Sequence, residues 1–189
     1  MSVKTEEDII ELIQADEWMM EIIHTAGKLH LPDWWICAGF VRSKIWDSLH
    51  HFEKRTKLSD VDVIYFDREN IDENTEKQLE SELKRMFPDV PWSVKNEARM
   101  HLINGLPPYS SAVDAMAKFP ETATALGIKA DEKQNIVLAA PHGIKDVINL
   151  EVKPTPFFAA NNRLMAIYQS RLRYKNWQAV WGKLKVYNR

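Results

Sequence analysis

The sequence predicts an α+β protein in which helices flank a mixed β-sheet. Stretches with apolar residues at helical spacing alternate with short runs rich in β-branched and aromatic residues. Apolar residues make up 45% and charged residues 28% of the chain, a balance typical of globular proteins. Because 189 residues can form one sizeable core, we expect a single domain over 1–189, with room for a helical subregion at 155–189.

The beginning of the chain predicts a helix, a strand and a second helix. Thr5 precedes three acidic residues and is expected to cap a helix that continues to Gly27. Residues 34–40, WWICAGF, form an apolar run typical of a buried strand. Apolar residues spaced along one face then predict a helix over 41–49.

Further strands and helices alternate through the rest of the chain. We expect strands at 60–65, 90–96 and 136–139, and helices at 75–87, 111–119, 120–127 and 162–177. Glycine and proline residues indicate a loop over 103–110, and a turn over 131–135 leads into the last strand.

Asp60 and Asp62 are the main candidates for catalysis. Residues two apart on a strand project from the same face, with Cα atoms roughly 6–7 Å apart. Two carboxylates that close repel each other and raise each other's pKa. A hard divalent cation such as Mg²⁺ (or Mn²⁺) removes this cost and prefers oxygen ligands. The alternative is a half-exposed strand whose acidic residues face solvent.

Gly39 lies between the predicted buried strand and the helix that follows it. A glycine there lets the backbone approach a ligand closely, and the N-terminus of a helix presents free N–H groups to an anion. Arg42 and Ser43 follow in the first helical turn, and basic residues such as Lys57 precede Asp60. These residues would suit a phosphate chain, although the basic stretch is also compatible with an ordinary surface loop.

Charge is distributed unevenly although the formal net charge is only −2. Acidic residues dominate positions 1–17, whereas Val152 to Arg189 contains basic residues and no acidic residue. This asymmetry indicates an anionic partner near the C-terminus or, alternatively, a solvated basic helix face.

Cys37 is the only cysteine and lies in an apolar run, so we expect a buried apolar side chain in a reducing compartment. The chain has no signal-peptide pattern and no apolar run of about 20 residues. These features predict a cytoplasmic protein without membrane association.

Two segments carry a resemblance to the nucleotidyltransferase superfamily. They are ICAGFVRSKIWD, which contains Gly39, and LSDVDVIYFD, which contains Asp60 and Asp62. With WSVKNEARMHLINGLPPYSSAVDAM, FPETATALGI and APHGIKDV, they resemble a bacterial family of uncharacterised nucleotidyltransferase-like proteins. A more distant likeness to the heads of tRNA-nucleotidyltransferases involves residues 38–42 and 143–147.

The resemblance implies a nucleotidyltransferase fold and a set of site residues. Asp60 and Asp62 would bind the metal and catalyse the reaction, and the nucleotide would be bound by Gly39, Phe40, Arg42, Ser43 and Ser59. Phe40 departs from the pattern, because the superfamily has a small residue there.

The superfamily commonly supplies a third acid from a later strand. In this sequence Asn96 and Glu97 are the candidates for that role. If the strand continues beyond residue 96, Arg99 and His101 share one face and are candidates for binding an acceptor or the leaving group.

The expected activity is metal-dependent transfer of a nucleoside monophosphate from a nucleoside triphosphate to an acceptor hydroxyl. The sequence leaves the acceptor open among a small molecule, a protein and an RNA end. Two alternatives remain: a non-catalytic nucleotide- or RNA-binding module of the same fold, and phosphohydrolysis with water as acceptor.

Overall fold

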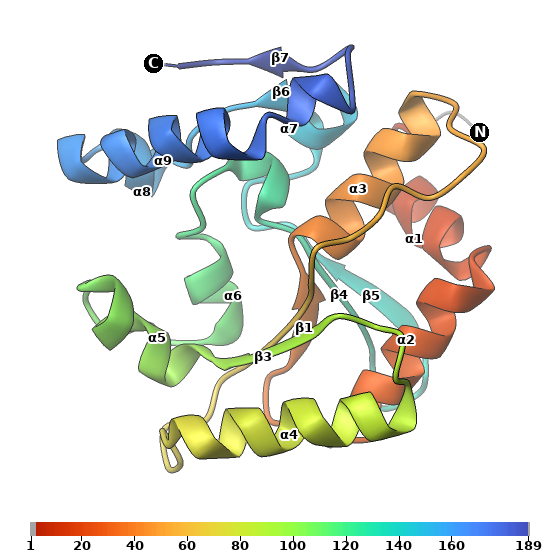
Figure 1. Cartoon of the computed structure of the whole chain (residues 1–189), viewed down its shortest axis with the longest axis vertical. Helices are drawn as coiled ribbons and strands as arrows, with labels where there is room; N and C mark the ends of the chain where they lie inside the picture. Colours follow the sequence, from red (N-terminus) through yellow and green to blue (C-terminus); the bar gives the residue numbers. More distant parts are fainter. Residues whose placement is uncertain (1–2, 189) are drawn as a thin grey trace.

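The computed structural model describes residues 3–188, so Arg189 of the basic segment lies outside the described residues. Helices flank a mixed five-stranded sheet (Figure 1), which confirms the predicted fold class. The strands are β1(Trp35–Cys37), β2(Val61–Tyr65), β3(Trp92–Asn96), β4(Gly127–Ala130) and β5(Ile136–Ala139), and β6(Glu151–Val152) pairs separately with β7(Lys185–Val186). The helices are α1(Glu6–Gln14), α2(Glu17–Gly27), α3(Gly39–Leu49), α4(Glu73–Met86), α5(Glu97–Asn104), α6(Ala112–Met116), α7(Lys145–Ile148), α8(Pro156–Ala159) and α9(Asn162–Lys175), with 3₁₀ turns at Thr122–Thr124 and Trp177–Ala179.

The strand order of the sheet is β3-β2-β1-β4-β5. β1 runs antiparallel to both β2 and β4, β4 runs antiparallel to β5, and β2 runs parallel to β3. The parallel pair requires a crossover, which α4 provides by packing against β3.

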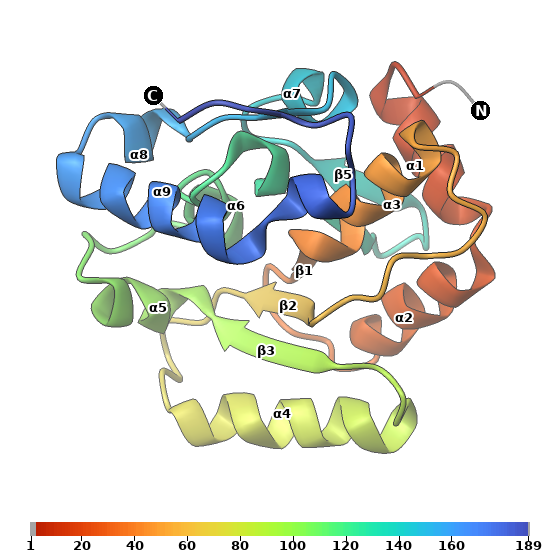
Figure 2. The same cartoon turned by 45° about the horizontal axis from the view of Figure 1, so that its top comes forward.

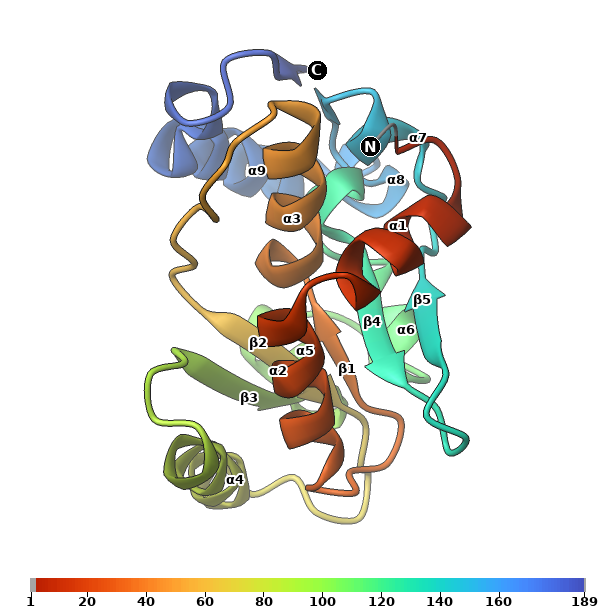
Figure 3. The ribbon, with the colours of Figure 1, turned by 90° about the vertical axis from the view of Figure 1, so that its right-hand side faces the viewer.

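Successive residues of the central strands point to opposite faces of the sheet. Ile36 and Val63 enter the main core, which also contains the buried residues of α1, α2 and α3. Trp35, Cys37 and Ile64 belong to a smaller cluster with α6 on the other face. Figure 3 shows α1, α2 and α3 beside the sheet. This alternation leaves Asp62 on the same face as Ile64.

The N-terminal segment forms two helices where the sequence predicted one. Thr5 and Asp8 form the expected capping box at the start of α1. Asp16 then accepts a hydrogen bond from the Met19 amide, which caps α2 and interrupts the helix. Lys44 and Arg55 pair with the same Asp16 carboxylate at 2.7 Å. The prediction of a continuous helix was therefore wrong, because the Asp16 side chain satisfies a backbone donor.

The segment after Pro120 is the second correction to the predicted elements. In place of a helix over 120–127, a 3₁₀ turn at Thr122–Thr124 leads into β4, which the sequence did not predict. A Cβ on Gly127, the first residue of this strand, would lie 2.4 Å from the Met116 methyl group, so the flexible Met116 side chain would have to shift. The α6 segment therefore packs closely against the sheet at this position.

The C-terminal segment packs onto the rest of the protein through aromatic side chains. The rings of Trp177 and Trp181 lie 5.8 and 5.1 Å from the ring of Trp46, which is fully buried in the main core. Tyr168 of α9 donates a hydrogen bond to the Val152 carbonyl. Figure 2 shows α9 running along one side of the molecule, with α4 on the opposite side. None of the helices in residues 3–188 combines the length and apolar content needed to cross a bilayer.

We propose that the C-terminal segment unfolds together with the sheet as one cooperative unit. Trp181→Ala removes a buried indole and its 2.8 Å hydrogen bond to Asp47, so we expect a loss of about 3–5 kcal/mol in the free energy of unfolding. The matched control, Tyr174→Ala, changes a side chain that is 84% exposed and should alter stability by no more than about 0.5 kcal/mol. Urea denaturation followed by circular dichroism measures both, and two separate transitions would contradict the proposal.

Candidate functional site

The pairing register of β1 and β2 brings the glycine turn next to the carboxylate pair. Cys37 lies opposite Asp62 in this antiparallel pair. The pairing ends there, because Gly39 already begins α3 and Asp60 precedes β2. Both residues line a cleft of about 530 Å³, together with Cys37 and Asp62. The cleft therefore combines the two features that the sequence singled out.

Three carboxylates line this cleft: Asp60, Asp62 and Glu97. Burial and the charge of Asp60 raise the pKa of Asp62 to about 6, although a hydrogen bond from Ser93 acts in the opposite direction. Burial and the charge of Asp62 raise the pKa of Glu97 to about 8. The acids thus repel one another in a poorly solvated place, an arrangement that favours a bound cation.

Glu97 reaches the cleft because β3 ends and α5 begins at that point. Asn96 caps α5 by accepting a hydrogen bond from the Ala98 amide at 3.0 Å. Glu97 is consequently the first residue of the helix, and it is 6% exposed. The strand ends at Asn96, so the condition under which Arg99 and His101 would share a strand face is not met, because the Asn96 cap turns the chain into a helix.

Arg42 contributes a buried positive charge to the cleft. Its guanidinium carbon lies 5.0 Å from the Trp46 ring centre and 4.6 Å from that of Trp177, and Arg42 as a whole is 9% exposed. Its Nε atom has no hydrogen-bond partner among the described residues. Burial lowers the pKa of Arg42 to about 10, with the charge of Glu121 opposing this shift. A buried arginine with an unused donor is suited to bind an anion.

The turn before α3 has an unusual backbone. Ala38 has φ 55° and ψ −116°, a conformation that L-residues seldom adopt. Its amide donates to the Leu126 carbonyl at 3.0 Å, and its carbonyl accepts from the Arg42 amide at 3.0 Å. A Cβ added to Gly39 would meet only an Arg42 nitrogen, at 3.5 Å. Internal packing therefore does not require a glycine at position 39.

The other predicted nucleotide-binding residues occupy different positions. Ser43 is 3% exposed and lines the cleft, and Ser59 lines it from the exposed loop before β2. The Phe40 side chain instead points into the core, 6.2 Å from the Trp18 ring. The bulky residue at position 40 thus leaves the turn unobstructed, and only its backbone is available to a nucleotide.

Asn96, Arg99 and His101 are absent from the lining of the cleft. The Asn96 amide group is bonded to the backbone of Asp67, Asn70 and Ala98. Arg99 binds the buried Glu76 carboxylate through two bonds of 2.9 and 2.8 Å.

His101 packs against the Tyr109 ring, and its Nδ1 atom is buried without a partner among the described residues. Asn96, Arg99 and His101 thus make structural contacts around α5 and do not reach the cleft.

The far wall of the cleft contains cations from the basic C-terminal segment, which the sequence motifs did not place beside the acidic pair. Arg171 and Lys175 of α9 line the cleft, as does Trp177. Arg171 is held by Glu121, which is fully buried, through a 2.9 Å contact. The sequence signal for these cations was the absence of acidic residues after position 151. The position of Arg171 and Lys175 opposite Asp62, however, depends on the tertiary fold.

Cys37 is 1% exposed beneath the cleft. Burial, with the nearby charges of Asp62, Glu97 and Asp60, raises the pKa of its thiol well above the ordinary value. A protonated, buried thiol is a poor nucleophile, in agreement with its predicted role as an apolar side chain.

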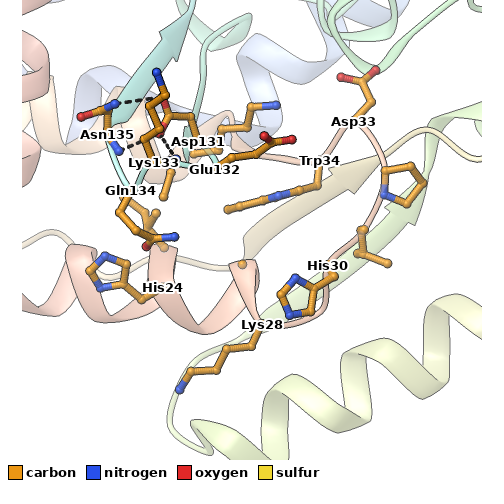
Figure 4. Close-up of a pocket in the computed structure, with 16 residues that line it drawn as sticks. His24, Lys28, His30, Asp33, Trp34, Asp131, Glu132, Lys133, Gln134 and Asn135 are labelled. Atoms are coloured by element: carbon orange, nitrogen blue, oxygen red, sulfur yellow. Dashed lines mark hydrogen bonds between the residues drawn. The ribbon is translucent and has the colours of Figure 1, made fainter.

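A second and larger cavity, of about 1130 Å³, lies at the opposite end of β1 and β4 (Figure 4). It is lined by side chains such as His24, His30 and Trp34, and by the hairpin that joins β4 to β5. Asp131 in this hairpin bonds to Lys133 and Asn135 of the same turn. This cavity lacks the clustered, perturbed carboxylates of the cleft, so the cleft is the better candidate for chemistry.

The donor set of the cleft suits a hard divalent cation. Within residues 3–188 no three histidine, cysteine, aspartate or glutamate side chains are arranged to hold a metal without other ligands. Mg²⁺, however, is commonly bound by one or two carboxylates and completed by water and substrate phosphates. Asp60 and Asp62 supply such a pair beside the turn at Gly39.

Comparison with known proteins relates the chain to enzymes that transfer nucleotides. The profile of a family described as nucleotidyltransferase matches residues 24–186. An NMR structure described as revealing a CCA-adding enzyme head domain has 36% sequence identity and a TM-score of 0.90, over 100% of this chain and 98% of that chain. The comparison with curated proteins gave no match.

More distant structures share the fold alone. A CCA-adding enzyme in complex with CTP is 10% identical with a TM-score of 0.56, over 97% of this chain and 43% of that chain. The Thermotoga maritima CCA-adding enzyme complexed with tRNA is 12% identical with a TM-score of 0.52, over 97% of this chain and 42% of that chain. The present chain thus spans less than half the length of these enzymes.

The contacts of Arg99 lead to a prediction about stability. Arg99→Met leaves the Glu76 carboxylate, 1% exposed, without its main partner, and should lower the free energy of unfolding by about 3–5 kcal/mol at pH 7. The control Lys77→Met removes only an exposed pair with Glu73 and should change stability by less than about 1 kcal/mol.

The ion pair between Glu76 and Arg99 also predicts how the stability difference between the wild type and Arg99→Met depends on pH. Burial tends to raise the pKa of Glu76, but hydrogen bonds from Arg99 and Asn96 outweigh it, and the pKa is lowered overall. The contribution of Glu76 is therefore present above its unfolded-state pKa and is lost as pH falls through the folded-state value. Urea unfolding of the wild type and Arg99→Met from pH 7 to pH 3 should show the difference in their free energies of unfolding becoming smaller. A difference that does not change with pH would contradict the stabilising role of the Glu76–Arg99 pair.

Proposed function

The chain belongs to the nucleotidyltransferase family, and on this premise we propose that it transfers a nucleoside monophosphate from a nucleoside triphosphate to an acceptor hydroxyl, with Mg²⁺ or Mn²⁺ as cofactor. The observation that carries the proposal is the convergence of Asp60, Asp62 and Arg42 on one cleft beside the turn at Gly39. In the reaction the acceptor hydroxyl gives up its proton to a base, its oxygen bonds to the α-phosphorus, and the bond to pyrophosphate breaks.

Asp60 and Asp62 would hold the metal, with Glu97 as the third acid. A bound divalent cation neutralises charge that develops on the phosphoryl oxygens. The supporting observation is that burial, together with repulsion by the neighbouring acids, raises the pKa of both Asp62 and Glu97. The role of Glu97 is supported by its burial at the cleft and by the absence of other acidic residues from the lining.

The triphosphate would bind between the start of α3 and the inner side of α9. The N-terminus of α3, an 11-residue helix, carries a partial positive charge and free N–H groups from Gly39 onward. Arg42 and Ser43 add side-chain donors, and Ser59 faces them from the loop before β2. Arg171 and Lys175 lie across the cleft, so that α9 would complete the site.

The acceptor is a small molecule, a protein or an RNA end. CCA-adding enzymes of similar fold have been solved with CTP and with tRNA, which makes an RNA end the first acceptor to test. A non-catalytic nucleotide- or RNA-binding module is the second candidate function. It is favoured by the lack, within residues 3–188, of a metal site built from three protein ligands.

A transfer assay with labelled nucleotides tests the proposed activity. The wild-type protein is incubated with each of the four triphosphates, with Mg²⁺ or Mn²⁺, and with candidate acceptors. Asp62→Asn should lower label transfer and pyrophosphate release by about 10³-fold, roughly 4 kcal/mol of activation free energy, because one metal ligand is lost.

The matched control is Asp89→Asn, which removes an exposed carboxylate outside the cleft and should leave transfer unchanged. Asp62→Asn also removes a source of repulsion, so its thermal unfolding temperature should equal or exceed that of the wild type. If no triphosphate gives transfer or pyrophosphate release with either metal, the binding module becomes the better account.

Gly39→Ala tests the turn that would hold the triphosphate. The added methyl group makes only an ordinary contact with Arg42, so the fold should be retained. It would occupy space at the turn and should weaken nucleotide binding roughly tenfold, or about 1.4 kcal/mol. Gly182→Ala, where a Cβ meets no atom within 4 Å, is the control. Equal affinities in a fluorescent-nucleotide titration would exclude this turn as the phosphate site.

A further inference from the structure

The loop between α3 and β2, visible in Figure 3, lines part of the cleft through Thr56, Lys57, Leu58 and Ser59. Within residues 3–188, Thr56 is the only residue of the stretch 53–60 whose amide donates a hydrogen bond, and the acceptor is the Asp47 carboxylate at 2.8 Å. The Thr56 hydroxyl donates to the same carboxylate at 2.6 Å. Arg55 anchors the loop to the α2 cap, outside the cleft. The position of Ser59, a proposed donor to the triphosphate, therefore depends on Asp47.

The same carboxylate also binds the C-terminal segment. The indole N–H of Trp181, which lines the cleft, donates to Asp47 Oδ1 at 2.8 Å. This is the oxygen that accepts the hydrogen bond from the Thr56 hydroxyl. The Trp181 amide donates to the carbonyl of Trp177, whose ring packs against Arg42. One buried oxygen atom thus joins two segments of the cleft lining that lie far apart in the chain.

The chemistry of Asp47 suits this connecting role. Its side chain is absent from the lining of the cleft, and the residue is 5% exposed, so a bound substrate does not contact it. An ionised carboxylate has only acceptor atoms and can receive several donors at once, and its hydrogen bonds are stronger than those between neutral groups. An asparagine would turn an N–H group toward at least one of these donors.

The proposed metal ligands Asp60 and Asp62 are held independently of Asp47. Val61 lies between the two acids in β2, and its amide donates to the Pro91 carbonyl at 2.8 Å. The sheet therefore fixes the carboxylate pair by its own hydrogen bonds. Loss of the Asp47 bonds would release the loop before β2 and leave the acids in place.

We propose that Asp47 is a positioning residue for the nucleoside triphosphate. Its carboxylate holds the loop before β2 and the indole of Trp181 in the arrangement that binds the triphosphate, and it acts on the substrate only through them. The inference rests on the proposed function, because its ligand is the triphosphate of that same site. Since the metal ligands keep their places, Asp47 contributes to nucleotide binding more than to the chemical step, and its loss raises KM more than it lowers kcat.

A titration of the full chain with a fluorescent nucleoside triphosphate and Mg²⁺ tests the role of Asp47. Asp47→Ala should weaken binding about tenfold, the equivalent of roughly one hydrogen bond to a charged group. In the transfer assay KM for the triphosphate should rise by a similar factor, with kcat within about twofold of the wild type. Asp47→Asn keeps the size of the side chain and one acceptor oxygen, so it should give a smaller loss, and it serves if Asp47→Ala does not fold.

A double-mutant cycle tests whether Trp181 acts through Asp47. Trp181→Phe keeps an aromatic ring and removes the N–H donor, and should weaken triphosphate binding about threefold because one of three bonds to the carboxylate is lost. In the Asp47→Ala background the same substitution should have no further effect. An equal loss in both backgrounds would show that the indole acts without Asp47 and would contradict the proposed connection.

Leu83→Ala is the control for a general loss of stability. Leu83 is fully buried in α4 and is absent from the lining of the cleft, so this variant should unfold at a lower temperature and bind the triphosphate as the wild type does, when both are measured well below their unfolding temperatures.

Three results would overturn the positioning role while leaving the proposed function intact. They are wild-type affinity in Asp47→Ala and Asp47→Asn, equal weakening by Leu83→Ala and Asp47→Ala, and a fall in kcat that exceeds the rise in KM. A different result, no binding of any of the four triphosphates by the wild type, would remove the proposed function and the positioning role with it.

Discussion

The antiparallel pairing of β1 with β2 is the constraint on which the rest of the site depends. Because Cys37 lies opposite Asp62, the turn after β1 and the acidic residues at the start of β2 meet at one edge of the sheet. A slip of one residue would reverse the faces of β2 and direct Asp62 into the main core. The buried residues Val61, Val63 and Tyr65 fix this register by packing into the main core on the opposite face. Packing on that face therefore determines that Asp62 points into the cleft.

Aromatic packing connects this edge of the sheet to the C-terminal segment. Arg42 lies against both Trp46 of α3 and Trp177 beyond α9, and Trp181 donates a hydrogen bond to Asp47. Trp177 and Trp181 belong both to the main core and to the lining of the cleft. Stability and the geometry of the cleft are therefore coupled, because the cations of α9 reach the cleft only when these indoles are packed.

Electrostatically unfavourable groups and backbone strain occur together at the cleft. Three acidic side chains lie near a buried arginine that lacks a carboxylate partner among the described residues, and Ala38 adopts a strained backbone conformation. Other buried acids have close partners, as with Glu76 and Arg99, Glu121 and Arg171, or Asp47, which accepts hydrogen bonds from Thr56 and Trp181. Unrelieved charge and strain confined to a single cleft are typical of sites that bind charged ligands.

The sequence alone was sufficient to predict the fold class, most helices and strands, the family resemblance, and the proximity of Gly39 to Asp60 and Asp62. These features depend on local periodicity and on motifs of a few neighbouring residues. Only the tertiary structure placed Glu97 at the start of a helix, Arg99 against Glu76, and Arg171 and Lys175 across from Asp62. Such contacts join residues far apart in the chain, as Glu121 and Arg171 show, and local patterns carry no information about which distant charge will be the partner.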